Sequence, residues 1–275
     1  MSFKYFSKNG EIRPIEEAVI SLERIEYTYG FGVYEAVRVS NGIVYFWEHH
    51  VERLLSSATI IGLEHPFSGE MVKKAILELV EKTEAETYNL KVLLIGAPKK
   101  EDALLSILCF NPCFPDKKMY RDGVELTTTN YERLYPHAKT LNMLQSYLSY
   151  RDARARGCYD SALINRRGHI TEGTRTNFFT IKGNTLYTPR EEEILLGVTR
   201  KAVLHVAQKN GFVVEEKDIR PEDLKQYDGV FLTSTSSKIV PIRKVGDIEC
   251  PPAPENLKHL MKLFGEFLEE SHGVL

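Results

Sequence analysis

The sequence predicts an α+β protein of two domains, and three observations support this. Residues 33–110 combine strand-like and helix-like hydrophobic patterns into one complete unit. Two prolines and a charge cluster interrupt the pattern next. A second, longer series of strands and helices then begins. We therefore expect an N-terminal α/β domain over residues 1–111, a linker over 112–119 and a larger C-terminal domain over 120–275.

The first domain is predicted to contain a β-hairpin. Two runs rich in strand-forming residues, 33–39 and 43–46, flank Asn41-Gly42, and this dipeptide is typical of a two-residue hairpin turn. The pattern that follows predicts two amphipathic helices, over residues 48–61 and 70–82. Two strands are predicted after them, over residues 90–95 and 104–110.

The second domain is predicted to contain three hairpins and several helices. Turn residues separate strand-like runs at Asn165–Gly168, at Gly183–Asn184 and near Gly246. A helix over 198–210 is followed by Gly211, where a C-cap glycine is expected. A strand over 124–129 and a helix over 141–156 are also predicted. Two further strands are expected near 213 and near 230, and a last helix over 254–270.

Composition excludes several classes of protein. With 275 residues, 43% hydrophobic and 27% charged, the chain can bury a large core without disulfides or metal. Its formal net charge of -2 indicates neither a nucleic-acid partner nor a membrane partner. An anionic ligand must therefore be bound by local groups.

The cysteines and the N-terminus predict a reduced, cytoplasmic protein without a metal site. Cys109 and Cys113 lack the second pair or nearby histidine that a zinc set needs. Residues 1–6 carry no apolar stretch like that of a signal peptide. The apolar run over 103–110 is too short to cross a bilayer.

An ordered set of residues carries the main functional signal. Lys139 is followed by Glu172 beside a glycine, by Gly197-Val198-Thr199 at a predicted helix start, and by the hydroxyl-rich run 233–237. A lysine amine can form a Schiff base, and a carboxylate can keep a pyridine nitrogen protonated. Helix amides and hydroxyls can hold a phosphate. Together these groups are what pyridoxal phosphate requires of a protein.

Each member of the set has a plainer alternative. Arg53 could be a solvated helix charge, Thr199 a simple helix cap, and 233–237 an ordinary polar loop. Gly30-Phe31-Gly32 is similar to the start of a dinucleotide-binding fingerprint, but it lacks the third glycine and leads into a strand. The order of the whole set therefore carries the cofactor prediction.

The chain resembles the class IV pyridoxal-phosphate enzymes, namely branched-chain aminotransferases, D-amino-acid aminotransferases and aminodeoxychorismate lyases. The resemblance covers nearly the whole chain, and its strongest stretches are residues 29–35, 50–58, 137–142, 172–179 and 196–200. It implies fold type IV, with a smaller N-terminal α/β domain, a C-terminal domain containing a barrel-like β-sheet, and the cofactor at the domain interface.

The resemblance also implies roles for single residues. Lys139 falls at the Schiff-base and catalytic lysine, and Glu172 at the carboxylate that faces the pyridine nitrogen. Leu195 falls where an aliphatic side chain packs on the cofactor ring. The cofactor-binding residues that it implies are Arg53, Lys139, Glu172, Asn177, Leu195, Val198, Thr199 and Thr235.

The features that separate the subfamilies conflict. Branched-chain enzymes usually have an aromatic residue where this chain has Leu144, and residues 139–144 and 233–237 look closer to D-amino-acid aminotransferases. The arginine and histidine that hold the substrate carboxylate in those enzymes have no counterpart in 94–99. Lyases tend to carry an arginine where this chain has Ile95.

The expected substrate pocket is aliphatic. Tyr29 and Tyr34 fall at aromatic pocket positions, Lys91 lies near the site of a branched-chain arginine, and Leu94 and Ile95 are apolar. We therefore predict a homodimer that transfers amino groups between branched-chain L-amino acids and 2-oxoglutarate. Transamination of D-amino acids and aminodeoxychorismate lyase activity are the alternatives. The presence of the proposed lysine and carboxylate disfavours a non-catalytic relative.

Overall fold

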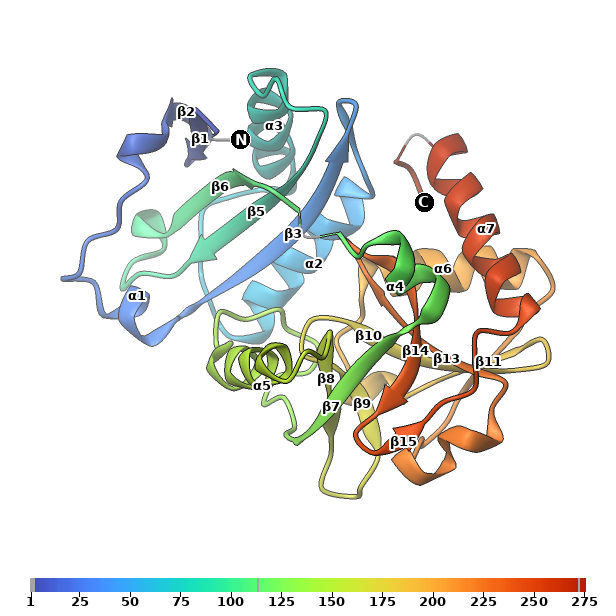
Figure 1. Cartoon of the computed structure of the whole chain (residues 1–275). Helices are drawn as coiled ribbons and strands as arrows, with labels where there is room; N and C mark the ends of the chain where they lie inside the picture. Colours follow the sequence, from blue (N-terminus) through green and yellow to red (C-terminus); the bar gives the residue numbers. More distant parts are fainter. Residues whose placement is uncertain (1–2, 113, 272) are drawn as a thin grey trace. The chain divides into compact units, whose positions relative to one another are not determined.

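The structure is a computed structural model that describes residues 3–112, 114–271 and 273–275, so Met1, Ser2 and Cys113 of the predicted segments lie outside the described residues. The chain divides into two compact units (Figure 1). Unit 1 comprises Met1–Pro112, His137–Asn142 and His272–Leu275. Unit 2 comprises Cys113–Pro136 and Met143–Ser271.

Unit 1 is built on a six-stranded antiparallel sheet in the order β2-β1-β6-β5-β3-β4. The predicted hairpin is confirmed, because Val39 pairs with Val44 and the turn residues Asn41 and Gly42 have φ of 51° and 76°. The strands are β1 (Tyr5–Lys8), β2 (Glu11–Pro14), β3 (Gly32–Ser40), β4 (Ile43–Val44), β5 (Thr87–Ile95) and β6 (Leu104–Phe110).

Two helices complete the core of unit 1, as predicted. Alternate residues of β3 and β5, such as Val37 and Val92, form one buried cluster with Leu54, Ile76 and Leu79 of these helices. The longer helices of this unit are α2 (Trp47–Ile60) and α3 (Gly69–Glu81), and the short ones are η1 (Ile15–Glu17), α1 (Ile25–Tyr29) and η2 (Lys100–Asp102).

Unit 2 contains a closed β-barrel, which confirms the barrel-like sheet. Its nine-stranded sheet runs β12-β11-β10-β13-β14-β7-β8-β9, with β15 paired to β14 outside this order. Because β9 also pairs with β10, the strands from β10 to β9 close on themselves. The pair Glu172–Asn177 makes this closure. The strands are β7 (Val124–Asn130), β8 (Asp160–Ile164), β9 (Ile170–Gly173), β10 (Asn177–Lys182), β11 (Thr185–Thr188), β12 (Val213–Glu216), β13 (Gly229–Ser234), β14 (Lys238–Val245) and β15 (Ile248–Glu249).

Apolar side chains from β10 and β13 contribute to the core of unit 2. Phe178 and Leu232 belong to one buried cluster, whereas Phe179 and Phe231 stack on each other with ring centroids 4.9 Å apart. The helices of this unit are α4 (Lys117–Asp122), α5 (Leu144–Ala155), η3 (Glu191–Glu193), α6 (Val198–Lys209), η4 (Pro221–Gln226) and α7 (Glu255–Glu270).

The predicted helix over 141–156 begins later than expected, at Leu144. The residues before it pair with the start of β3. Thr140 bridges Val33, and the Leu141 amide donates to the carbonyl of Gly32 at 2.8 Å. Thr140 and Leu141 are therefore in non-helical backbone that pairs with β3, so the tertiary contact overrides the local preference.

The described cysteines, Cys109, Cys158 and Cys250, are free thiols, and burial raises the pKa of each, that of Cys250 to about 12. Because a raised pKa keeps a thiol protonated and the thiolate is the nucleophile, we expect these cysteines to react slowly. In the described ranges, no helix combines the length and the apolar character that crossing a membrane would require.

We expect Leu79→Ala to destabilise unit 1 by about 2–5 kcal/mol, because Leu79 is fully buried and truncation leaves a cavity. Leu77→Ala in the same helix is the matched control, since Leu77 is 39% exposed and its truncation should cost less than about 1 kcal/mol. Urea unfolding followed by Trp47 fluorescence measures both, because this single tryptophan lies in α2. Equal losses would contradict the core assignment.

Candidate functional site

The predicted site residues fall into two groups, one in each unit. The residues in unit 1 are Tyr29, Tyr34, Arg53, Lys91 and Lys139. The residues in unit 2 are Glu172, Asn177, Leu195, Val198, Thr199 and Thr235. The two groups are described in turn.

The backbone of Lys139 is held from two sides within unit 1. Its carbonyl accepts from the Tyr34 amide at 2.9 Å, and its own amide donates to the Ser57 hydroxyl at 3.0 Å. The Nζ atom lies 4.5 Å from the centroid of the Tyr34 ring, within the range of a cation–π contact. The half-buried amine thus extends from an anchored backbone.

Arg53 belongs to a compact charge cluster with Glu35 and His50. The Nε and Nη2 atoms of Arg53 donate to the two oxygens of Glu35 at 2.6 and 2.7 Å. Nδ1 of His50 lies 2.7 Å from Oε2 of Glu35. The sequence interpretation missed Glu35, although a signal existed. It occupies an inward position of β3, between Val33 and Val37, where only apolar residues are expected.

The protonation states in this cluster follow from burial and charge. Burial alone would raise the pKa of Glu35, but the charge of Arg53 and the hydrogen bonds from Arg53 and His50 outweigh it and lower that pKa to about 2. Burial lowers the pKa of His50, although Glu35 opposes this. At neutral pH Glu35 is therefore an anion, and neutral His50 donates its Nδ1–H to it.

The residues of the expected aliphatic pocket lie on both faces of β5 and around it in unit 1. Leu94 packs in the hydrophobic core, so its predicted place in a pocket is wrong. The alternation of β5 explains this, because Leu94 points to the helix-covered face and Lys91 to the opposite one. Nζ of Lys91 lies 5.9 Å from the Tyr34 ring centroid, and Tyr29 is 78% exposed.

Glu172, Asn177 and Leu195 form one hydrogen-bonded group in unit 2. Asn177 pairs with Glu172 across the barrel closure, and its side chain donates to the Leu195 carbonyl at 2.7 Å. The Leu195 amide donates to Oε2 of Glu172 at 3.3 Å. A Cβ at Gly197 would lie 2.0 Å from Oδ1 of Asn177, so the close approach requires glycine there.

The carboxylate of Glu172 has a charged partner that the sequence interpretation did not identify. Nε of Arg133 donates to its Oε1, and Nη2 of Arg133 donates to the carbonyl of Thr174 at 3.2 Å. A guanidinium keeps its charge at any physiological pH. The buried carboxylate is therefore compensated and fixed in direction. Neither spacing nor periodicity in the sequence links these two residues.

The start of α6 and the β13–β14 turn supply anion-binding groups. No side chain caps the first turn of α6 at Gly197, so the amides of Val198 and Thr199 lie at an uncapped, positive helix end. Thr235 lies in the β13–β14 turn. This turn is tied by the Ser237 amide, which donates to Oγ of Ser234 at 3.2 Å.

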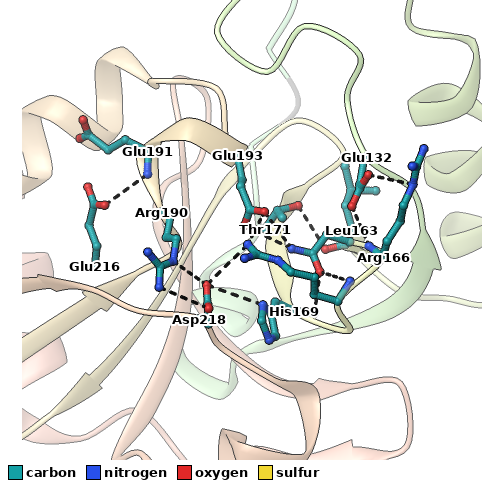
Figure 2. Close-up of polar contacts among 12 residues, drawn as sticks. Glu132, Leu163, Arg166, His169, Thr171, Arg190, Glu191, Glu193, Glu216 and Asp218 are labelled. Atoms are coloured by element: carbon teal, nitrogen blue, oxygen red, sulfur yellow. Dashed lines mark hydrogen bonds and ion pairs between the residues drawn. The ribbon is translucent and has the colours of Figure 1, made fainter.

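A polar network supports the strand that carries Glu172 (Figure 2). Figure 2 shows side chains from the β8–β9 turn beside those of η3. Nδ2 of Asn165 donates to Glu193 at 3.1 Å, and Oδ1 of Asn165 accepts from the His169 amide at 2.9 Å. The contacts connect the turn to the segment that leads to Leu195. No cluster of metal-binding side chains occurs in the part of the chain that the structure describes.

Comparison with known proteins places this geometry in a family. The family model described as amino-transferase class IV matches residues 32–245. D-alanine aminotransferase of Bacillus licheniformis is 31% identical over 246 residues, which cover 86% of this chain and 87% of that protein. A putative branched-chain-amino-acid aminotransferase of Methanocaldococcus jannaschii is 28% identical over 249 residues, covering 86% of each.

Solved structures of similar fold agree with this match. The branched-chain aminotransferase of Thermoproteus uzoniensis with norvaline has a TM-score of 0.86 and 27% identity, covering 98% of this chain and 96% of that one. The branched-chain amino acid aminotransferase from Escherichia coli has a TM-score of 0.85 and 23% identity, covering 99% of this chain and 96% of that one. The second likeness concerns the fold alone.

We expect Glu35→Gln to cost about 3 kcal/mol of stability at neutral pH, and we expect the cost to shrink in acid. The folded pKa of Glu35, about 2, lies below its ordinary value of 4.5, so its contribution is complete above pH 4.5 and is lost as pH falls towards 2. Urea unfolding of parent and variant at about pH 7, about pH 5 and about pH 3.5 measures the gap. A gap that widens on acidification would reject the ionised, paired carboxylate.

Proposed function

Because this chain belongs to the class IV aminotransferase family, we propose that it transfers the amino group of a branched-chain L-amino acid to 2-oxoglutarate. The family match over residues 32–245 is the observation that carries aminotransferase activity. The choice of a branched-chain substrate goes beyond the family match and depends on the residues proposed for the substrate pocket. A cytoplasmic location belongs to the same proposal.

Class IV aminotransferases use pyridoxal phosphate, and the described residues fit this cofactor. Glu172 offers a buried, charge-compensated carboxylate for a protonated pyridine nitrogen. The uncapped start of α6, with Thr199, offers donors for a phosphate, as does the hydroxyl of Thr235. Arg53 would add a guanidinium contact to the phosphate, and Leu195 an aliphatic surface for the ring.

We assign the proton transfer at the substrate Cα to the amine of Lys139. When bound, the cofactor supplies an electron sink that weakens the Cα–H bond. Lys139 suits the role of base because Ser57 and Tyr34 hold its backbone and the residue is only partly buried. The carboxylate of Glu172 favours the protonated form of the ring nitrogen, and Arg133 holds that carboxylate in a fixed direction.

Two observations favour branched-chain substrates. The fold of the Thermoproteus uzoniensis enzyme, a branched-chain aminotransferase, matches 98% of this chain. Residues 94–99 also lack the arginine and histidine expected of a D-specific carboxylate site. Lys91, beside Tyr34 on the exposed face of β5, is the cation that we propose for the substrate carboxylate.

A second candidate is transfer from D-alanine. The observation that favours it is the relative at 31% identity, which is a D-alanine aminotransferase. Residues 139–144 point in the same direction, because Leu144 replaces the aromatic residue of branched-chain enzymes. Aminodeoxychorismate lyase activity is a third candidate, distinguished by release of pyruvate.

We expect kcat/KM with 2-oxoglutarate to be higher for L-leucine than for D-alanine. Each methylene buried in an apolar pocket contributes about 0.8 kcal/mol, so leucine should gain more than alanine. Coupled assays of both donors, with Lys139→Ala as the inactive control, measure the preference. A clear preference for D-alanine would reject the branched-chain proposal and leave the cofactor assignment intact. Pyruvate release from aminodeoxychorismate without an acceptor would favour the lyase.

We also propose that the active form is a homodimer. The surface of α5 supports this, because the helix buries Ser146, Ser149 and Ala153 while Leu144 and Tyr147 are exposed. Large apolar groups on a helix exterior are typical of a protein interface.

Sedimentation equilibrium should therefore give twice the chain mass of 31.5 kDa. Tyr147→Glu should shift the protein towards the monomer, because it places a charge in the proposed interface. Val213→Glu is the control, since Val213 is an exposed valine on β12. A monomeric parent at micromolar concentration, or a dimer indifferent to Tyr147→Glu, would contradict this interface.

A further inference from the structure

Glu35 is a carboxylate in the apolar row of a strand. β3 directs Val33, Glu35, Val37 and Val39 to the helix-covered face, and the other three belong to the core. Taking an ion out of water costs several kcal/mol even after relaxation, and replacing a buried ion pair with apolar side chains is often neutral or stabilising. Removing Glu35 alone is costly because it leaves Arg53 unpaired, but replacing the whole pair need not be, so stability alone does not account for a carboxylate at this position.

The partners of Glu35 come from one face of α2. His50 and Arg53 are three positions apart, so their side chains lie on the same side of the helix. The side chain of Glu35 is 1% exposed and that of Arg53 is 12% exposed. The guanidinium thus extends from a buried anchor towards the surface of the unit.

The contact fixes the orientation of the guanidinium. Glu35 engages the edge formed by Nε and Nη2 through two parallel bonds of 2.6 and 2.7 Å, which restrict rotation of the planar group. The His50 ring contacts Oε2 at 2.7 Å and holds the carboxylate from a second direction. Nη1 lies on the opposite side of the guanidinium from the Nε–Nη2 edge.

The same contact cancels the charge of Arg53. Ionised Glu35 and protonated Arg53 together carry no net charge, and His50, with its pKa lowered by burial, adds none at neutral pH. An arginine whose task was to attract a phosphate by charge alone would be better without this neighbour. The pairing of Arg53 with Glu35 is understandable if the orientation of the guanidinium matters more for phosphate binding than its net charge.

We infer that Glu35 is a positioning residue, which holds Arg53 in the orientation needed to donate a directed hydrogen bond to the cofactor phosphate. The inference rests on the proposed function, because it takes Arg53 as a phosphate contact. It extends that proposal by assigning the phosphate affinity to a buried pair rather than to Arg53 alone. His50 supports the pair by holding Oε2.

An orienting role and a purely charge-cancelling role of Glu35 predict different results for two substitutions. Glu35→Gln removes the charge and keeps the size of the side chain, whereas Glu35→Asp keeps the charge and withdraws the carboxylate by one methylene. If Glu35 orients Arg53, both variants bind pyridoxal phosphate more weakly. If Glu35 only cancels charge, Glu35→Gln binds it more tightly and Glu35→Asp resembles the parent.

The experiment measures the Kd of the full-length apoprotein for pyridoxal phosphate and for pyridoxal, which lacks the phosphate. We expect Glu35→Gln and Glu35→Asp each to raise the Kd for pyridoxal phosphate about tenfold or more and to leave the Kd for pyridoxal within about twofold. Glu125→Gln is the matched control, because it removes the charge of another strand glutamate paired with an arginine, Arg243, and neither residue is assigned to the cofactor. It should change neither Kd.

A double-mutant cycle with Arg53→Ala tests whether Glu35 acts through Arg53. In the Arg53→Ala background, Glu35→Gln should change the Kd for pyridoxal phosphate by less than about twofold, since no guanidinium is left to orient. An equal loss in both backgrounds, or an equal loss of pyridoxal affinity, would overturn the inference and leave Glu35 a purely structural residue. Glu35→Asp replaces Glu35→Gln in the double-mutant cycle if the Glu35→Gln variant does not fold.

Failure of the proposed function has a different signature. If Arg53→Ala weakens pyridoxal phosphate and pyridoxal equally, Arg53 does not bind the phosphate. That result would overturn the phosphate assignment itself and, with it, the inference about Glu35. If Arg53→Ala weakens only pyridoxal phosphate binding, whereas the Glu35 variants weaken pyridoxal binding equally, Arg53 remains a phosphate contact. Glu35 is then not its positioning residue.

Discussion

The pairing of Glu172 with Asn177 is the contact on which the arrangement of unit 2 depends. It closes the barrel by joining β9 to β10, and Asn177 also pairs with Thr233 of β13. A closed barrel leaves its strands little freedom to shift in register, because every edge is paired. The residues at the closure are thereby held beside Leu195, whose carbonyl and amide contact Asn177 and Glu172. The same contact that completes the fold also positions the proposed pyridine-binding carboxylate.

Each unit buries one carboxylate beside an arginine, and the two pairs serve different ends in our proposal. Arg133 compensates Glu172 so that the carboxylate stays fixed in direction towards the cofactor ring. Glu35 compensates Arg53 so that the guanidinium stays fixed towards the cofactor phosphate. A buried charge without a partner would be costly in either place. In both pairs one member restrains the group that we assign to the cofactor, and the fixed geometry comes with a loss of net charge.

Local sequence patterns were sufficient for most elements and insufficient where distant segments meet. The Asn41-Gly42 hairpin and the helices α2, α3 and α6 were predicted closely, because turn chemistry and amphipathic periodicity act over a few residues. The start of α5 was predicted too early, since Thr140 and Leu141 pair with β3 instead. Leu94 was assigned to a pocket although the strand alternation directs it into the core.

The sequence by itself determined the α+β fold class, the family resemblance and the order of Lys139, Glu172, Thr199 and Thr235 along the chain. These depend on residue type and spacing, which are local properties. Only the tertiary structure showed that Arg133 pairs with Glu172 and Glu35 with Arg53. Partners separated by many residues are selected by strand register and helix packing, and these are set by the burial of whole faces rather than by any short motif.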